Sequence, residues 1–125
     1  LSCLQGKTPE ITSPDFVRDF IYIEDVVDLY QRLPDMRVSP GEIFNVGSGT
    51  QHSVGEVTDT IIGIVGKPLK PVAGLPRRWA NEPEVWQADM SKTSDSLNWT
   101  PNHDLQTGLR KSVGWFENHR HLYGK

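Results

Sequence analysis

The chain has 125 residues, close to the commonest size of one domain, and we expect a single domain over residues 1–125. Its formal net charge of -3 gives no global basic field, which excludes a protein that binds nucleic acid or a membrane mainly by charge. No apolar run approaches the roughly 18 residues that span a bilayer, no signal peptide opens the chain, and the lone Cys3 cannot form an internal disulfide. We expect a cytoplasmic protein and, because Leu1 stands first, a piece of a longer chain or a processed one.

The first third of the chain predicts short extended runs followed by an amphipathic helix. Residues 1–6 are typical of a helix end closed by a glycine, 8–12 of an extended segment and 19–23 (DFIYI) of a short strand or extended run. Asp25 is placed to cap the next helix. The apolar face expected for that helix consists of Val26, Val27, Tyr30 and Leu33.

The middle of the chain predicts a strand, a glycine turn and a helix. Residues 42–46 (EIFNV) have the aromatic and β-branched composition of a strand. Ser53 and Glu56 form the S-x-x-E capping box, which predicts a helix that begins at Ser53 and stops at Gly66. Its expected apolar face consists of Val54, Val57, Ile61, Ile64 and Val65.

The last part of the chain predicts two further short strands, at 69–72 and 84–88 (EVWQA), separated by an irregular stretch. Asp89 can cap a short helix that runs to Leu97, and a final helix begins near Asp104. The apolar positions of the final helix are Leu105, Leu109, Val113 and Phe116. Short strands that alternate with helices predict a mixed α/β fold.

Gly47 and Gly49 stand between a predicted strand and a predicted helix, where a dinucleotide-binding glycine loop would lie. The full fingerprint needs a third glycine at the position of His52, and the next predicted strand carries Lys70 instead of a ribose-binding acid. We therefore interpret the glycines as a tight turn with positive φ angles, with a dinucleotide loop as the alternative.

Three arginines are candidate phosphate ligands. Arg18 precedes an apolar run, and Arg77 and Arg78 lie in a stretch rich in glycine and proline. A guanidinium matches two phosphate oxygens at once and stays charged at any working pH, so arginines from distant segments can together clamp a pyrophosphate. The alternative for each arginine is a solvated or salt-bridged surface residue.

The histidines and tryptophans predict no catalytic or metal site. His119 and His121 are two residues apart on a predicted helix and point in different directions, and no second cluster supplies further ligands. A serine nucleophile elbow is absent from the sequence. The tryptophans, which we expect in the core or at an interface, are Trp79, Trp86, Trp99 and Trp115.

Three segments occur in a fixed order along the chain. The first is RDFIYIEDVV at 18–27, the second is EIFNVGSG at 42–49, and the third runs from ADMSK at 88–92 to LNWTP at 97–101. Together they resemble the carboxyl-terminal portion of extended short-chain dehydrogenases/reductases that act on nucleotide sugars. The likeness extends over most of the chain.

The resemblance implies a fold and a ligand. The fold is a small substrate-binding domain, and its strand near Phe44, with the helix before it, would complete a Rossmann sheet formed by an amino-terminal half. The implied ligand is a nucleotide-diphosphate sugar. An apolar face that lacks the other half would be exposed, so self-association of the isolated chain is also expected.

Particular contacts follow from the same resemblance. Arg18 would contact the diphosphate from one side, and Arg78, with Arg77 as the alternate, from the other. The run at 9–12, which includes Ile11, would lie along the base. The candidates for the ribose contact are Asn81 and Glu82.

The family performs its chemistry with residues that this sequence does not contain. Those residues are a G-x-x-G-x-x-G loop for NAD(P) and a Tyr-x-x-x-Lys pair, whereas Val26 and Pro34 stand four positions after Tyr22 and Tyr30. We therefore expect no catalytic residue here, an inactive isolated chain, and NAD(P) only in a full-length oxidoreductase, isomerase or lyase. The alternative is a non-catalytic module that binds a nucleotide diphosphate or a protein.

Overall fold

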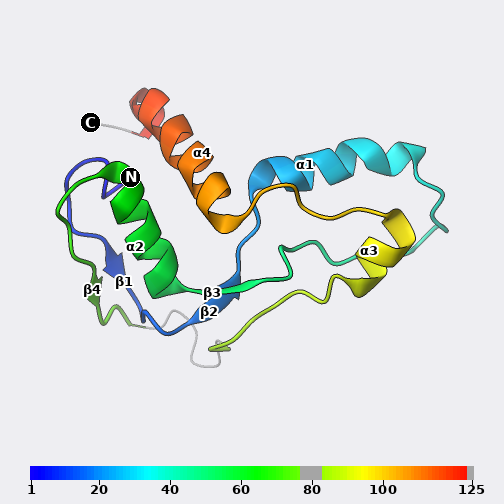
Figure 1. Cartoon of the computed structure of the whole chain (residues 1–125), viewed down its shortest axis with the longest axis horizontal. Coiled ribbons are helices and arrows are strands. Elements are labelled where there is room, and N and C mark those ends of the chain that lie inside the picture. The colour runs from blue at the N-terminus through cyan, green and yellow to red at the C-terminus, as the bar shows by residue number, and fades with distance from the viewer. Residues whose placement is uncertain (77–82, 124–125) are drawn as a thin grey trace.

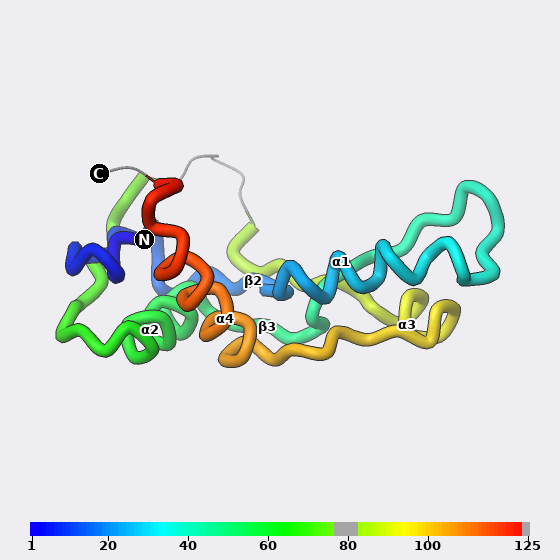
Figure 2. The backbone as a smooth tube through the Cα atoms, turned by 90° about the horizontal axis from the view of Figure 1, so that it is seen from above, coloured from blue at the N-terminus to red at the C-terminus, as the bar shows by residue number. Residues whose placement is uncertain are grey.

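The computed structural model describes residues 1–76 and 83–123. Within these residues the chain forms a mixed α/β structure, which confirms the predicted fold class. Figures 1 and 2 show an elongated molecule with α1 and α3 toward one end, α2 and α4 toward the other, and β2 and β3 between them. The helices are α1 (Ile23–Arg32), η1 (Leu33–Asp35), α2 (Val54–Val65), α3 (Ser91–Leu97), α4 (Leu105–Asn118) and η2 (Arg120–Tyr123).

Two small sheets connect distant parts of the chain. In the first sheet β1 (Glu10–Ile11) pairs in parallel with β4 (Val72–Ala73). In the second sheet β2 (Val17–Asp19) pairs antiparallel with β3 (Gln51–Ser53). The antiparallel pair places the beginning of the first sequence motif directly beside the glycine turn of the second.

The predicted strands are paired only in part, and one of them is not paired at all. Of the short strand or extended run expected at 19–23, only Asp19 lies in a strand, because β2 ends there and α1 begins at Ile23. Residues 42–46 form no assigned strand, and in the described part of the chain the N–H groups of residues 43–46 donate to no acceptor. The stretch at 84–88 contributes one isolated parallel bridge to β2. It is not a strand, because a strand needs a neighbour that supplies a ladder of hydrogen bonds.

The predicted helix starts are confirmed where a nearby side chain accepts a hydrogen bond from an N–H group of the first helical turn. Ser53 accepts a hydrogen bond from the Glu56 N–H (3.0 Å), and Gly66 ends α2 with a φ of 70°. Asp104 accepts from the Thr107 N–H (2.7 Å) at the start of α4. The expected helix end at 1–6 is instead a series of turns in the described structure.

The start of α1 differs from the prediction because Asp25 has a tertiary role. Tyr22 occupies the N-cap position, and the carboxylate of Asp25, which is only 1% exposed, accepts hydrogen bonds from the N–H groups of Asn102 and His103. The Nδ1 atom of His103 also lies 2.8 Å from this carboxylate. Asp25 therefore holds the loop before α4 against the first turn of α1.

The hydrophobic core lies between α1, α3 and the segment after α3. Its buried centre is Leu29, Leu97 and Trp99, and the Trp99 ring nitrogen donates to Asp28 (2.9 Å). The face predicted for α1 is wrong in part, because Leu29 faces the core whereas Val27 and Tyr30 are 45% and 69% exposed. The partly buried residues around the core are Ile21, Leu33, Met36, Phe44, Val46 and Met90.

The tryptophans divide between the core and the surface. Trp99 confirms the core assignment, whereas Trp86 and Trp115 are exposed and Trp79 lies outside the described residues. Among residues 1–76 and 83–123, no helix is long and apolar enough to cross a membrane.

Candidate functional site

Arg18 lies in the middle of β2, opposite His52 of β3. Its Nη1 donates to the carbonyl oxygens of Val17 (2.8 Å) and Glu84 (3.1 Å), and its guanidinium carbon lies 5.4 Å from the centre of the Phe16 ring. These contacts hold the guanidinium in the wall of an open cavity of about 420 Å³. The residues that line this cavity, here called the arginine cavity, are Arg18, Asp19, Asn45, Val46, Trp86, Gln87, Ala88 and Asp89.

The opposite wall of the arginine cavity comes from the segment at 84–89. This segment runs beside β2, because the Val17 N–H donates to Glu84 (2.7 Å) and the Trp86 N–H donates back to Val17 (3.0 Å). The amide of Gln87 also donates to the Gly49 carbonyl oxygen. Trp86 is 60% exposed, so the cavity has a large aromatic side chain beside a fixed cation.

The carboxylate of Asp19 joins the three segments that surround the cavity. Oδ1 accepts from the N–H and the hydroxyl of Ser48, both at 2.6 Å, and Oδ2 accepts from the N–H groups of Gly49 (3.0 Å) and Ala88 (3.1 Å). Burial raises the pKa of Asp19, but these hydrogen bonds outweigh it, and the pKa lies below its ordinary value of 3.8. Asp19 is therefore a carboxylate that the surrounding donors keep ionised.

The glycine turn accommodates this carboxylate. A Cβ atom added at Gly47 would lie 2.6 Å from Oδ2 of Asp19 and 2.6 Å from the Cβ of Ala88, whereas Gly49 has a φ of 72°. The amides of Ser48 and Gly49 already bind Asp19, so they do not offer the donors that a dinucleotide pyrophosphate needs. The structure therefore favours the tight turn over the dinucleotide loop.

Of the other sequence-predicted site residues, only Ile11 lies in the described part of the chain, and it is not brought together with Arg18. Ile11 lies in β1, paired with Ala73, and is half-buried outside the lining of the arginine cavity. The remaining candidates lie outside the described residues, and they are Arg77, Arg78, Asn81 and Glu82.

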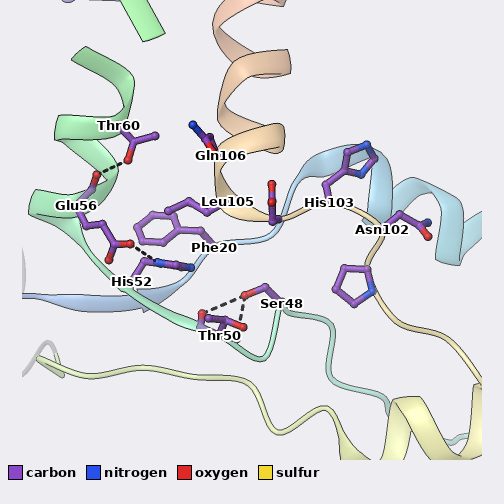
Figure 3. A pocket seen from close by; sticks show the side chains of 12 residues that line it. Phe20, Ser48, Thr50, His52, Glu56, Thr60, Asn102, His103, Leu105 and Gln106 are labelled. Carbon is purple, nitrogen blue, oxygen red and sulfur yellow. Dashed lines mark hydrogen bonds and ion pairs between the residues drawn. The ribbon is translucent and has the colours of Figure 1, made fainter. Parts of the chain in front are cut away.

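A larger cleft of about 630 Å³ lies between the beginnings of α2 and α4, and sequence reasoning missed it (Figure 3). His52 and Glu56 lie side by side in this cleft, with Nδ1 and Oε1 2.8 Å apart. The four-residue spacing of His52 and Glu56 is the signal in the sequence from which this pair could have been found. The described lining contains no lysine or arginine, so the smaller arginine cavity is the better match for a phosphate.

Within residues 1–76 and 83–123, no group of three or more His, Cys, Asp or Glu side chains is placed to hold a metal ion. The imidazoles of His52 and His103 each pair with a carboxylate instead.

The known proteins to which the chain is similar include several UDP-sugar 4-epimerases. No family model matches the chain. The chain is 32% identical over 116 residues to the UDP-glucose 4-epimerase of Mycolicibacterium smegmatis, covering 92% of this chain and 36% of the relative. It is 36% identical over 102 residues to the UDP-glucose 4-epimerase of Corynebacterium glutamicum, covering 80% and 30%. The crystal structure of the Thermotoga maritima UDP-glucose 4-epimerase with UDP-glucose matches with a TM-score of 0.82 and 29% identity, over 94% of this chain and 37% of that one.

The fold and these relatives place the chain in one protein family. The chain belongs to the extended short-chain dehydrogenase/reductase family of NAD-dependent epimerases and dehydratases. It spans about a third of the length of the relatives it matches, which is consistent with the carboxyl-terminal portion that the sequence motifs resemble.

Proposed function

We propose that this chain is the nucleotide-sugar-binding part of a cytoplasmic NAD(P)-dependent epimerase, dehydratase or reductase, and that the arginine cavity holds the nucleotide diphosphate. The observation that carries the proposal is Arg18, whose guanidinium is fixed by two carbonyl oxygens in the wall of a cavity. The Thermotoga maritima relative, solved with UDP-glucose, supports a nucleotide sugar as the ligand class.

In this proposal Arg18 binds the diphosphate from the β2 side. Arg78, with Arg77 as the alternate, approaches from the loop that precedes the segment at 84–89. Ile11 lies along the base. The ribose contact belongs to Asn81 or Glu82.

The reaction itself belongs to the complete enzyme. NAD(P), when bound there, supplies transient oxidation of the sugar. The described glycine turn does not fit this cofactor, because Asp19 occupies its amides, and no chemical step is assigned to this chain. Its own contribution is to bind the nucleotide diphosphate and to hold the sugar in place.

The apolar surface of α1 supports a partner for this chain. Ile23, Val27 and Tyr30 follow one helical face and are 63%, 45% and 69% exposed, and Ile43 is 80% exposed. Residues 43–46, whose N–H groups have no acceptor in the described part of the chain, pack through Phe44 and Val46 against the same core as Leu29 of α1. This surface fits an amino-terminal Rossmann half that adds a strand and covers α1, and the isolated chain self-associates through it.

The test is an amide NMR titration of the chain with UDP, GDP, CDP and dTDP, and with NAD as the control. We expect one diphosphate to shift the resonances of residues around the arginine cavity and NAD to leave them unchanged. Arg18→Ala should weaken that binding by about 1.5–3 kcal/mol, the value of a charge-assisted hydrogen bond. Arg32→Ala, which removes an exposed arginine paired with Asp28 on α1, is the matched control. A folded Arg18→Ala chain that binds as tightly as the parent would contradict the assignment.

A second candidate function is a non-catalytic interaction module. The exposed face of α1 favours it, because such a face can bind a protein partner without any catalytic half. The coding sequence upstream of Leu1 separates the two functions. An in-frame Rossmann half with Tyr-x-x-x-Lys supports the enzyme, and a start codon at that point supports the module.

A further inference from the structure

The carboxylate of Asp19, in β2, accepts hydrogen bonds from two segments that lie outside β2. Its two oxygens accept three backbone N–H groups and one hydroxyl, from Ser48, Gly49 and Ala88. Ser48 and Gly49 belong to the glycine turn, and Ala88 belongs to the segment at 84–89. One side chain thus fixes two separate segments to β2.

The same segments form the walls of the arginine cavity. Arg18 directly precedes Asp19, Gln87 directly precedes Ala88, and both line the cavity. Other described contacts also hold the segment at 84–89: Val17 exchanges backbone hydrogen bonds with Glu84 and Trp86, Arg18 donates to the Glu84 carbonyl oxygen, and Gln87 donates to the Gly49 carbonyl oxygen. Asp19 adds the bond to the Ala88 N–H and fixes the turn that Gln87 contacts. The position of Gln87 relative to Arg18 therefore depends in part on the Asp19 carboxylate.

We propose that Asp19 is a positioning residue for nucleotide-diphosphate binding, which acts by holding the glycine turn and the segment at 84–89 against Arg18. The inference rests on the proposed function of the arginine cavity. Asp19 does not touch the ligand in this account, since its oxygens are occupied by protein donors.

Whether removal of the Asp19 carboxylate weakens or strengthens nucleotide binding distinguishes a positioning role from a direct electrostatic effect. A carboxylate beside a diphosphate repels it, so removal of the charge alone would strengthen binding. Loss of the four hydrogen bonds moves the walls apart and weakens binding. Asp19→Asn keeps the size of the side chain, removes its charge, and presents an amide NH2 to groups that are themselves donors.

The matched control is Asp59→Asn. Asp59 is an exposed carboxylate of α2 that lies outside the lining of the arginine cavity. Both substitutions remove one negative charge from the chain. We expect Asp19→Asn to weaken UDP binding by about ten- to a hundredfold. Asp59→Asn should bind UDP as tightly as the parent.

Ser48→Ala is the milder variant in case Asp19→Asn does not fold. It removes the hydroxyl bond to Asp19 and leaves the three backbone donors in place. We expect a few-fold weakening of UDP binding, in proportion to the loss of one neutral donor from four.

Amide hydrogen exchange tests the positioning role without any nucleotide. Asp19→Asn should accelerate exchange at Ala88 and at Trp86, whose N–H donates to Val17, and Asp59→Asn should leave both amides as they are. If the parent binds no nucleoside diphosphate, the proposed function fails, and the exchange result still decides whether Asp19 holds the segment. Unchanged exchange in Asp19→Asn, or UDP binding at least as tight as in the parent, would overturn the inference.

Discussion

Asp19 and Asp25 use the same chemistry in two different regions of the molecule. Each carboxylate accepts backbone N–H groups from a segment far away in the sequence, Asp19 at the arginine cavity and Asp25 between α1 and the loop before α4. Asp25 is 1% exposed and lines neither the arginine cavity nor the larger cleft, whereas Asp19 forms part of a cavity wall. The comparison indicates that one type of contact stabilises the fold in one region and shapes a cavity wall in the other.

The largest expected effect concerns Asp25. Asp25→Ala removes a buried carboxylate and leaves the N–H groups of Asn102 and His103 without an acceptor, so the free energy of unfolding should fall by about 3–5 kcal/mol. Urea denaturation measures this change. Asp59→Asn, at an exposed position of α2, should stay within about 0.5 kcal/mol of the parent. A loss for Asp25→Ala as small as that of the control would mean that Asp25 does not join α1 to α4.

The next effect concerns the space around Asp19. Gly47→Ala places a methyl group 2.6 Å from Oδ2 of Asp19 and 2.6 Å from the Cβ of Ala88. Both distances are shorter than Cβ contacts in folded proteins, so a neighbouring group must move. We expect a loss of about 1–3 kcal/mol in the free energy of unfolding, together with weaker UDP binding. Gly63→Ala in α2 is the control, because nothing lies within 4 Å of a Cβ atom there, and it should stabilise the helix slightly.

The stability that Asp19 contributes should depend on pH. The pKa of Asp19 is lower in the folded chain than its ordinary value of 3.8, so its ionised form stabilises the fold. This contribution is fully present above pH 3.8 and is lost as the pH falls through the folded-state pKa. The stability difference between the parent and Asp19→Asn should therefore be largest near neutral pH and shrink below pH 3.8. A difference that grows on acidification would contradict the assigned sign.

The smallest effect on stability is expected on the exposed face of α1. The double variant Val27→Glu and Tyr30→Glu changes side chains that are 45% and 69% exposed, so the free energy of unfolding should change by less than about 1 kcal/mol. Sedimentation should show less self-association than in the parent, because two charges now interrupt the apolar surface. Equal self-association in both chains would remove this face as the contact surface.

The parts of the fold that the sequence predicted depend on neighbours within a few residues. Ser53 and Asp104 cap their helices through donors three positions ahead, so their motifs were sufficient. Asp25 was assigned to the same local role and instead binds the loop at 102–103, a contact that no local pattern contains. The segment at 42–46 has the composition of a strand but no strand beside it in the described structure, since pairing depends on a neighbour and not on composition.

The candidate site was predictable to a similar extent. Arg18 was found from its charge and its motif, and the structure places it in a cavity wall. The role of Asp19 was not predictable, because its donors at Ser48 and Ala88 are 29 and 69 positions away. The tight turn was expected with positive φ angles at Gly47 and Gly49, but of these two only Gly49 has one, and the crowding at Gly47 is visible only when three segments are folded together.

The central claim is that Asp19 acts on nucleotide binding through the position of Arg18 and the wall opposite it. The most direct measurement is a double-mutant cycle of UDP affinity with Arg18→Ala, Asp19→Asn and the double variant. If Asp19 positions Arg18, the double variant should bind about as weakly as Arg18→Ala alone, because the residue being positioned is already gone. Effects that simply add, or a parent chain that does not bind UDP, would contradict the account.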